Sequence, residues 1–196
     1  MRTIDIINSI SKNDIILMNL YNELPPSAKE NFLIDMISSE LQSTNEIEGG
    51  ASSKEQLVST TKEVIKGDGY DRQLKFSNIS NSYLKLKKDK LEKPKNYKGI
   101  RRVYDEITID GVEEENTPDG DYFRKKAVYV HKNGREIHRG VTSGDDSESY
   151  IIFLVEKLLD FLNKDEKCNS LIKNAIFHYY FGYIHPFYDG NGRTSR

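Results

Sequence analysis

Apolar residues in the first half of the chain recur every three or four positions, which is the period of an amphipathic helix. The clearest stripe consists of Phe32, Leu33, Met36, Ile37 and Leu41. This stripe predicts a helix that Ser27 caps and that runs to about Glu48, before Gly49-Gly50. An earlier helical segment must end at Pro25-Pro26, because two consecutive residues without N–H donors stop a helix.

Five further helices are predicted from the same spacing and from start and stop signals. They are expected at about 52–67, at 78–91, at 99–108, from residue 147 or 149, and from residue 169. The capping box Ser52-Ser53-Lys54-Glu55 marks the start of the first of them. The last two carry mainly apolar stripes and should be core helices, whereas the acidic stretch 111–121 contains Gly and Pro and is expected to be a loop.

A β-hairpin is predicted where the apolar period changes from 3.6 to 2. The runs 127–132 and 135–139 flank Asn133-Gly134, which tolerates two positive φ angles. The expected pairs are Lys132 with Arg135, Val130 with Ile137, and Tyr129 with His138. This register would place Val128, Val130 and Ile137 on one face, and Tyr129, His131 and His138 on the other. One face can pack on helices, while a free edge could accept a strand from another protein.

Composition fits a single globular core with a helical extension: 196 residues, 36% of them apolar and 31% charged. The net charge of -2 gives no general field for nucleic acid. Cys168 is the only cysteine, which excludes an internal disulfide and fits a reducing compartment. The N-terminus lacks a signal peptide, and the longest apolar run, 151–155, is too short to cross a bilayer. We therefore expect a soluble cytoplasmic protein that contacts neither nucleic acid nor membrane.

Residues with chemical uses are concentrated in the last twelve positions, His185-Pro186-Phe187-Tyr188-Asp189-Gly190-Asn191-Gly192-Arg193-Thr194-Ser195-Arg196. Pro186 keeps His185 out of the right-handed helical region, so the preceding apolar helix must end there. The imidazole would then lie at a helix C-terminus, where the dipole favours its cationic form and assists a base that takes a proton from a hydroxyl. Asp189 offers the hard oxygen that magnesium prefers.

The remaining polar positions of this segment suit phosphate. Gly190 and Gly192 leave main-chain amides open to an anion, and Arg193 and Arg196 are spaced to clamp a polyphosphate from one side of a following helix. Taken singly, a His before Pro is usually a helix terminator and Asp-Gly-Asn-Gly is usually a turn. A calcium loop starting at Asp189 is excluded, because its sixth position would be a threonine and the sequence ends before its twelfth.

As a whole, the segment resembles the signature of the Fic family, His-Pro-Phe-x-Asp-Gly-Asn-Gly-Arg-x-x-Arg, at every defined position. The resemblance extends more loosely over the last two helices and the hairpin at 123–141, which looks like the target-binding flap of that family. It implies a mostly α fold, with a Fic-like helical bundle and one β-hairpin flap at 96–196, preceded by an N-terminal helical region at 1–95.

The resemblance also implies an activity, in which AMP is transferred from ATP to a Ser, Thr or Tyr hydroxyl of a target protein, or of the protein itself, with release of pyrophosphate. By matching position, His185 would be the general base and Asp189 would hold Mg²⁺. An anion hole would be formed by Gly190, Asn191 and Gly192. Arg193 would bind a phosphate, and Arg196 would reach the γ-phosphate. Phe187 would anchor the loop. The target would add a strand to the flap residues Val128, Tyr129, Val130, Ile137 and His138. The phosphorylating subgroup, with Lys in place of the second Gly, is not matched at position 192.

A second match lies in the N-terminal region, within about 43–50. Thr44-Asn45-Glu46-Ile47-Glu48-Gly49 is similar to the inhibitory motif of the family, Ser/Thr-x-x-x-Glu-Gly/Asn. Thr44 and Glu48 are one helical turn apart. The resemblance implies that Glu48 pairs with Arg196 and takes the place of the γ-phosphate, and Gly49 completes the motif. Two alternatives stay open: a hydrolase that removes AMP, with Glu48 orienting water, and a regulatory module that binds nucleotide without turnover.

The sequence as written stops at Arg196, whereas family members normally continue with a helix. We expect that three residues after Arg193 are too few to supply a helix dipole. The chain, apparently truncated, would then bind nucleotide poorly and be inactive. Phe177, Phe181 and Ile184 would be partly exposed and would favour a homo-oligomer.

Overall fold

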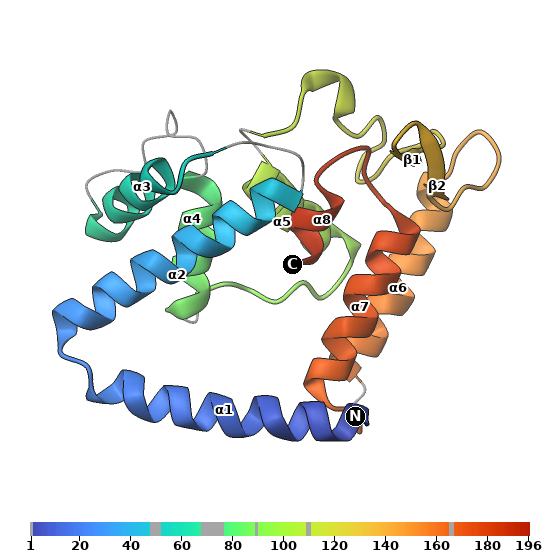
Figure 1. Cartoon of the computed structure of the whole chain (residues 1–196). Coiled ribbons are helices and arrows are strands. Elements are labelled where there is room, and N and C mark those ends of the chain that lie inside the picture. Colours follow the sequence, from blue (N-terminus) through green and yellow to red (C-terminus); the bar gives the residue numbers. More distant parts are fainter. Residues whose placement is uncertain (1, 48–51, 68–76, 89, 109–110, 165–166) are drawn as a thin grey trace. The chain divides into compact units, whose positions relative to one another are not determined.

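The computed structural model describes residues 2–47, 52–67, 77–88, 90–108, 111–164 and 167–196. The described residues are mostly helical with one antiparallel β-hairpin, which confirms the predicted fold class (Figure 1). The chain divides into two compact units, residues 1–63 and 64–196. None of the described helices combines the length and the apolar character that a membrane span requires.

The first unit contains the helices α1 (Thr3–Glu23) and α2 (Pro26–Ile47) and most of α3 (Lys54–Lys66). The predicted break at Pro25-Pro26 is confirmed, but Ser27 does not cap α2. The helix begins at Pro26, two residues before the expected first helical residue Ala28, because proline is pre-organised for the first helical position. The Ser38 hydroxyl donates to Thr61 Oγ1 at 3.4 Å and joins α2 to α3 in the core of this unit.

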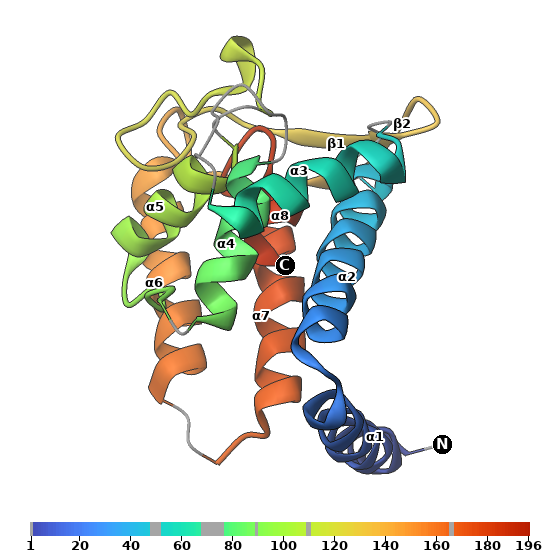
Figure 2. The ribbon, with the colours of Figure 1, turned by 90° about the vertical axis from the view of Figure 1, so that its left-hand side faces the viewer.

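The second unit is built on two long helices, α6 (Glu148–Lys164) and α7 (Ser170–Ile184), which lie side by side (Figure 1, Figure 2). Asn169 caps α7, since its side chain accepts a hydrogen bond from the Leu171 amide at 2.9 Å. The shorter helices α4 (Ser77–Lys87) and α5 (Tyr97–Thr108) precede them, and α8 (Asn191–Ser195) contacts both α5 and α7. The predicted loop at 111–121 contains one turn of 3₁₀-helix, Glu114–Asn116.

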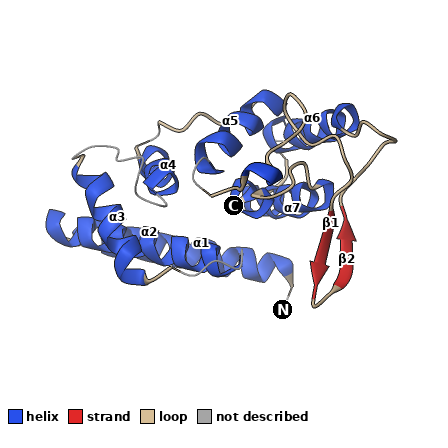
Figure 3. Cartoon of the chain, turned by 90° about the horizontal axis from the view of Figure 1, so that it is seen from above, coloured by secondary structure: helices blue, strands red, loops and turns tan. Residues whose placement is uncertain are grey.

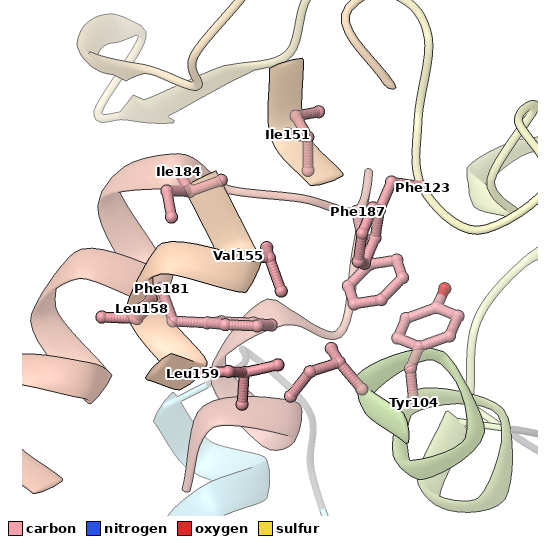
Figure 4. Close-up of a cluster of buried hydrophobic side chains, with 10 residues drawn as sticks. Tyr104, Phe123, Ile151, Val155, Leu158, Leu159, Phe181, Ile184 and Phe187 are labelled. Atoms are coloured by element: carbon pink, nitrogen blue, oxygen red, sulfur yellow. The ribbon is translucent and has the colours of Figure 1, made fainter. Parts of the chain in front are cut away.

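Aromatic rings form the centre of the second unit (Figure 4). Phe123, Phe181 and Phe187 are fully buried, and Phe187 stacks on Tyr104 with ring centroids 3.7 Å apart. The role predicted for Phe187 as an anchor is therefore confirmed. The expected exposure of Phe181 and Ile184 is wrong, because α6 and the loop after α7 cover both side chains. His178 is exposed on α7.

The hairpin consists of β1 (Tyr129–Lys132) and β2 (Arg135–Arg139) and projects away from the helices of its unit (Figure 3). Asn133 and Gly134 have φ angles of 52° and 73°, so the predicted turn is confirmed. The predicted register holds only next to the turn. A bulge shifts it by one residue, so Val130 pairs with His138 and Tyr129 with Arg139. Ile137 is exposed instead of lying beside Val130, while His138 turns toward α7.

Candidate active site

The site is centred on the point where α7 ends. His185 adopts the left-handed conformation, with φ 53° and ψ 63°, and its amide donates to Phe181 O at 2.9 Å. A positive φ is uncommon for residues other than glycine, and such strain is typical of functional sites. The expected helix end before Pro186 is confirmed, and the reversal directs the chain into the glycine-containing loop.

A buried arginine holds this helix end in place. The Arg124 guanidinium is fully buried and donates from Nε to His185 O at 2.7 Å and from Nη2 to Ile184 O at 3.3 Å. Its other bonds go to Val141 O at 2.7 Å and Lys126 O at 2.6 Å, on the two segments that lead into and out of the hairpin. All four acceptors are main-chain carbonyls, and within the described residues Arg124 forms no ion pair.

The geometry leaves no room for a larger residue beside this arginine. A Cβ atom at Gly140 would lie 2.5 Å from Arg124 Nη2 and 3.0 Å from His185 Cβ. The Gly140 amide donates to Val128 O at 3.1 Å, and the next amide, of Val141, donates to Ile184 O at 3.2 Å. The base of the hairpin is therefore bonded directly to the end of α7. Neither Arg124 nor Gly140 was predicted as a site residue, because nothing local in the sequence distinguishes them.

The His185 ring is half-buried, and its Nδ1 lies 3.3 Å from Gly182 O. A carbonyl only accepts, so Nδ1 carries the proton and Nε2 keeps a lone pair. Burial lowers the pKa of His185 below its ordinary value. The charges of Arg124 and His138 lower the pKa further, whereas the Gly182 carbonyl and the Asp189 carboxylate raise it by less. The expectation that the helix dipole favours the cation is wrong, because desolvation outweighs it. The imidazole is therefore a neutral base.

His138 is the second histidine of the site. Its Nε2 lies 2.8 Å from Tyr183 O, and its ring centroid lies 6.2 Å from that of His185. Of the five predicted flap residues, it is the one that connects the hairpin to the end of α7. Tyr129 is exposed, and the guanidinium carbon of Arg139 lies 5.3 Å from its ring centroid.

The loop after His185 is braced from within. Asn191 accepts from the Phe187 amide at 3.0 Å and donates to Phe187 O at 2.9 Å, so its side chain closes the loop and only its main chain remains for an anion. Gly190 has φ 76°, and a Cβ there would lie 2.8 Å from Thr108 Cγ2. Helix α8 starts directly afterwards. The helix has five residues and begins inside the signature, and the expectation that it is too short to supply a helix dipole stays a prediction.

The charged residues of the loop face each other. Arg193 Nη2 lies 3.3 Å from Asp189 Oδ2, while Asp189 Oδ1 accepts from the Gly190 amide at 2.5 Å. Arg193 Nε is buried and lacks a hydrogen-bond partner among the described residues. Arg196 is exposed at the other end of α8. The structure thus brings His185, Asp189, the two glycines and Arg193 together on one short loop.

Asp189 fits a magnesium ion, although it is the one carboxylate that the loop supplies. No group of three or more metal-ligating side chains occurs in the described part of the chain. Magnesium commonly takes one or two protein carboxylates and completes its shell with water and substrate phosphates. The 41% exposure of the Asp189 side chain leaves room for such ligands.

Two predicted inhibitory residues, Glu48 and Gly49, lie outside the described residues. Thr44, the third, is buried in α2 of the first unit and lies 3.5 Å from Glu40 Oε1. Its place in α2 agrees with the helical spacing used to propose the motif, and its role stays a prediction.

Comparison with known proteins identifies the family. Residues 95–196, just over half of the chain, match the sequence profile of the Fic/DOC family. A Fic family protein from Desulfovibrio desulfuricans G20 has a similar structure, with a TM-score of 0.61 and 21% sequence identity. The alignment covers 100% of this chain and 56% of that protein. The chain therefore belongs to the Fic/DOC family, whose members typically transfer nucleotide-derived groups.

We expect the substitution Arg124→Lys to lower the free energy of unfolding by about 2–4 kcal/mol, because a lysine cannot reach carbonyls on three segments and each buried unpaired carbonyl costs about 1–3 kcal/mol. Urea unfolding followed by circular dichroism measures the change. Arg135→Lys is the matched control in the exposed β2 strand, with an expected change of about 0.5 kcal/mol or less. Equal stability of the two variants would contradict the role given to Arg124.

Proposed function

We propose that this chain is a protein adenylyltransferase that transfers AMP from ATP to a Ser, Thr or Tyr hydroxyl of a target protein or of itself. The observation that carries the proposal is the position of His185, held at the end of α7 with Nδ1 3.3 Å from Gly182 O, which leaves Nε2 to accept a proton, and followed by the glycine loop. A general base must reach the hydroxyl beside the phosphate that it attacks. His185 lies five residues before Gly190, the first residue of the phosphate-binding amides, so the base and the loop are close enough to meet that requirement.

In the proposed reaction, an acceptor strand lies along the hairpin and presents its hydroxyl to His185. Nε2 takes the hydroxyl proton as the oxygen attacks the α-phosphorus of ATP. The bond from the α-phosphorus to the bridging oxygen breaks, and pyrophosphate leaves. The main-chain amides at Gly190 to Gly192 and the Arg193 guanidinium offset the charge that develops on the phosphates. Protonated His185 then returns its proton to solvent.

Asp189 would hold a magnesium ion in this reaction. The bound ion would neutralise phosphate charge and orient the leaving pyrophosphate. Asp189 must first release Arg193, since the two side chains are paired in this structure. Arg193 would then be free to bind a phosphate, so a single rearrangement would prepare both residues. The glycine at position 192 favours nucleotidyl over phosphoryl transfer, because the phosphorylating subgroup of the family that the signature resembles has lysine at this position.

We expect His185→Ala to lower AMP transfer about 10²- to 10⁴-fold while ATP binding stays within about twofold, because the variant removes the base and no nucleotide ligand. Intact-mass analysis after incubation with ATP and magnesium measures transfer, and calorimetry measures binding. His178→Ala is the matched control, an exposed histidine on the same helix. Unchanged transfer in His185→Ala would remove the base assignment.

Binding without any AMP-labelled product in the unaltered protein would favour a regulatory module, and loss of AMP from a modified substrate would favour a hydrolase.

The transfer rate should depend on pH through His185. Only the neutral imidazole accepts a proton, and burial lowers its pKa below the ordinary value of about 6.5. We therefore expect a rate that is constant at high pH, has a midpoint below pH 6.5, and falls about tenfold per pH unit well below that midpoint. Single-turnover labelling between pH 5 and 8 tests this, with circular dichroism as the control for folding. A midpoint above pH 6.5 would contradict the buried, neutral base.

Glu48 is the proposed inhibitory residue. We expect Glu48→Gly to raise labelling by at least about tenfold, because its carboxylate would no longer compete with the γ-phosphate for Arg196. Labelling with radioactive ATP measures the effect. Glu46→Gly is the matched control, two residues earlier and exposed on α2. Equal labelling of the unaltered protein and Glu48→Gly would refute the inhibitory role.

A further inference from the structure

One hydrogen-bonded side chain of the signature loop, Tyr188, lies at a position that the motif leaves undefined. Tyr188 occupies the undefined position of the signature, yet its hydroxyl donates to Asp119 Oδ1 at 2.8 Å and accepts from the Lys126 amide at 3.1 Å. Asp119 Oδ1 also accepts from the Lys125 amide at 2.7 Å. Two consecutive amides at the entrance to the hairpin are thus bonded to one tyrosine and one aspartate.

The protonation states of the pair suit this arrangement. Burial raises the pKa of Tyr188, and its hydrogen bond to Asp119 raises it further, so the phenol keeps its proton and donates. Burial alone would raise the pKa of Asp119, but the bonds from the Lys125 amide and the Tyr188 hydroxyl outweigh it and hold the pKa below the ordinary value. At neutral pH the donor is protonated and the acceptor is a carboxylate.

The position of the Tyr188 hydroxyl is itself fixed. Phe187, the residue before it, is fully buried in the aromatic core, and Asp189, the residue after it, is paired with Arg193. In the segment that leads into the hairpin, the Arg124 amide donates to Pro186 O at 3.1 Å. Residues 124, 125 and 126 are therefore each attached, directly or through Asp119, to the loop that begins at His185.

We propose that the hydrogen-bonded pair Tyr188–Asp119, here called the clasp, fixes the position of the segment that leads into the hairpin relative to the phosphate-binding loop. Tyr188 is then a positioning residue for the acceptor strand. This inference rests on the proposed function, because it assumes that the hairpin presents the hydroxyl to His185. Lys126 is the last residue with such an attachment before β1 begins at Tyr129. A change at that point would alter how the chain enters β1, while Val141 and His138 hold the other strand at the end of α7 and Asn191 braces the loop.

The substitution Tyr188→Phe tests the clasp, because it removes one hydroxyl and keeps the ring. We expect amide exchange at 125–132 to become about two- to tenfold faster, as befits the loss of one hydrogen bond, with unchanged exchange in α6 and α7. Hydrogen exchange followed by mass spectrometry measures this without any substrate. Tyr179→Phe, an exposed tyrosine on α7, is the matched control. Exchange at 125–132 that is unchanged in Tyr188→Phe would overturn the clasp.

Transfer kinetics distinguish a positioning role from a merely structural one. With dephosphorylated casein as an extended acceptor, Tyr188→Phe should raise KM for casein about two- to tenfold, while kcat and the Kd for ATP stay within about twofold. A lower kcat at unchanged KM would contradict positioning of the acceptor. Absence of transfer in the unaltered protein would count against the proposed function, and the exchange result would still decide the clasp. Exchange at 125–132 is also compared in Tyr188→Phe, Asp119→Ala and the double variant. Additive effects of the two substitutions would overturn the clasp, since a clasp requires both partners.

Discussion

The second unit depends on how the last carbonyls of α7 are satisfied. A helix leaves its final four carbonyls without intrahelical partners, and a buried helix end needs donors from elsewhere. Here the Tyr183 carbonyl is 2.8 Å from His138 Nε2, the Ile184 carbonyl accepts from the Val141 amide and Arg124, and the His185 carbonyl accepts from Arg124. Every one of these donors comes from the hairpin or its base. The end of the helix, the start of the signature loop and the flap therefore form as one assembly, and none of them can be placed without the others.

The guanidinium of Arg124, which binds the carbonyls at the end of α7, also affects the chemistry of the site. A buried guanidinium is costly to desolvate, and four carbonyl oxygens, two of them at the negative end of a helix, offset the cost without adding a counter-charge. Arg124 forms no ion pair within the described residues, and its charge adds to the effect of burial in lowering the pKa of His185. Arg124 thus shapes the helix end and, after burial, contributes to the lowered pKa of His185.

Local rules predicted those parts of the structure that local forces determine. Apolar spacing gave the helices, Asn133-Gly134 gave the turn, and Pro186 gave the end of α7, because each signal lies within a few residues of its effect. Arg124 and Asp119 were missed, since their partners are up to 69 residues away. The hairpin register failed for a related reason: alternation alone cannot reveal a bulge that turns His138 toward α7. The dipole argument for His185 failed because the depth of burial is a property of the assembled core.

The signature loop is already ordered before any substrate enters, because its side chains satisfy one another. Asn191 closes the loop on Phe187, and Asp189 neutralises Arg193. A free phosphate would have to separate Arg193 from Asp189 and leave the carboxylate unpaired, and a free metal ion would leave the guanidinium unpaired. A polyphosphate that carries its own metal ion supplies both opposite charges at once, so it alone can replace the internal pair without leaving either charge uncompensated. On the proposed function, the pair would therefore favour the complete nucleotide–metal complex over its separate parts.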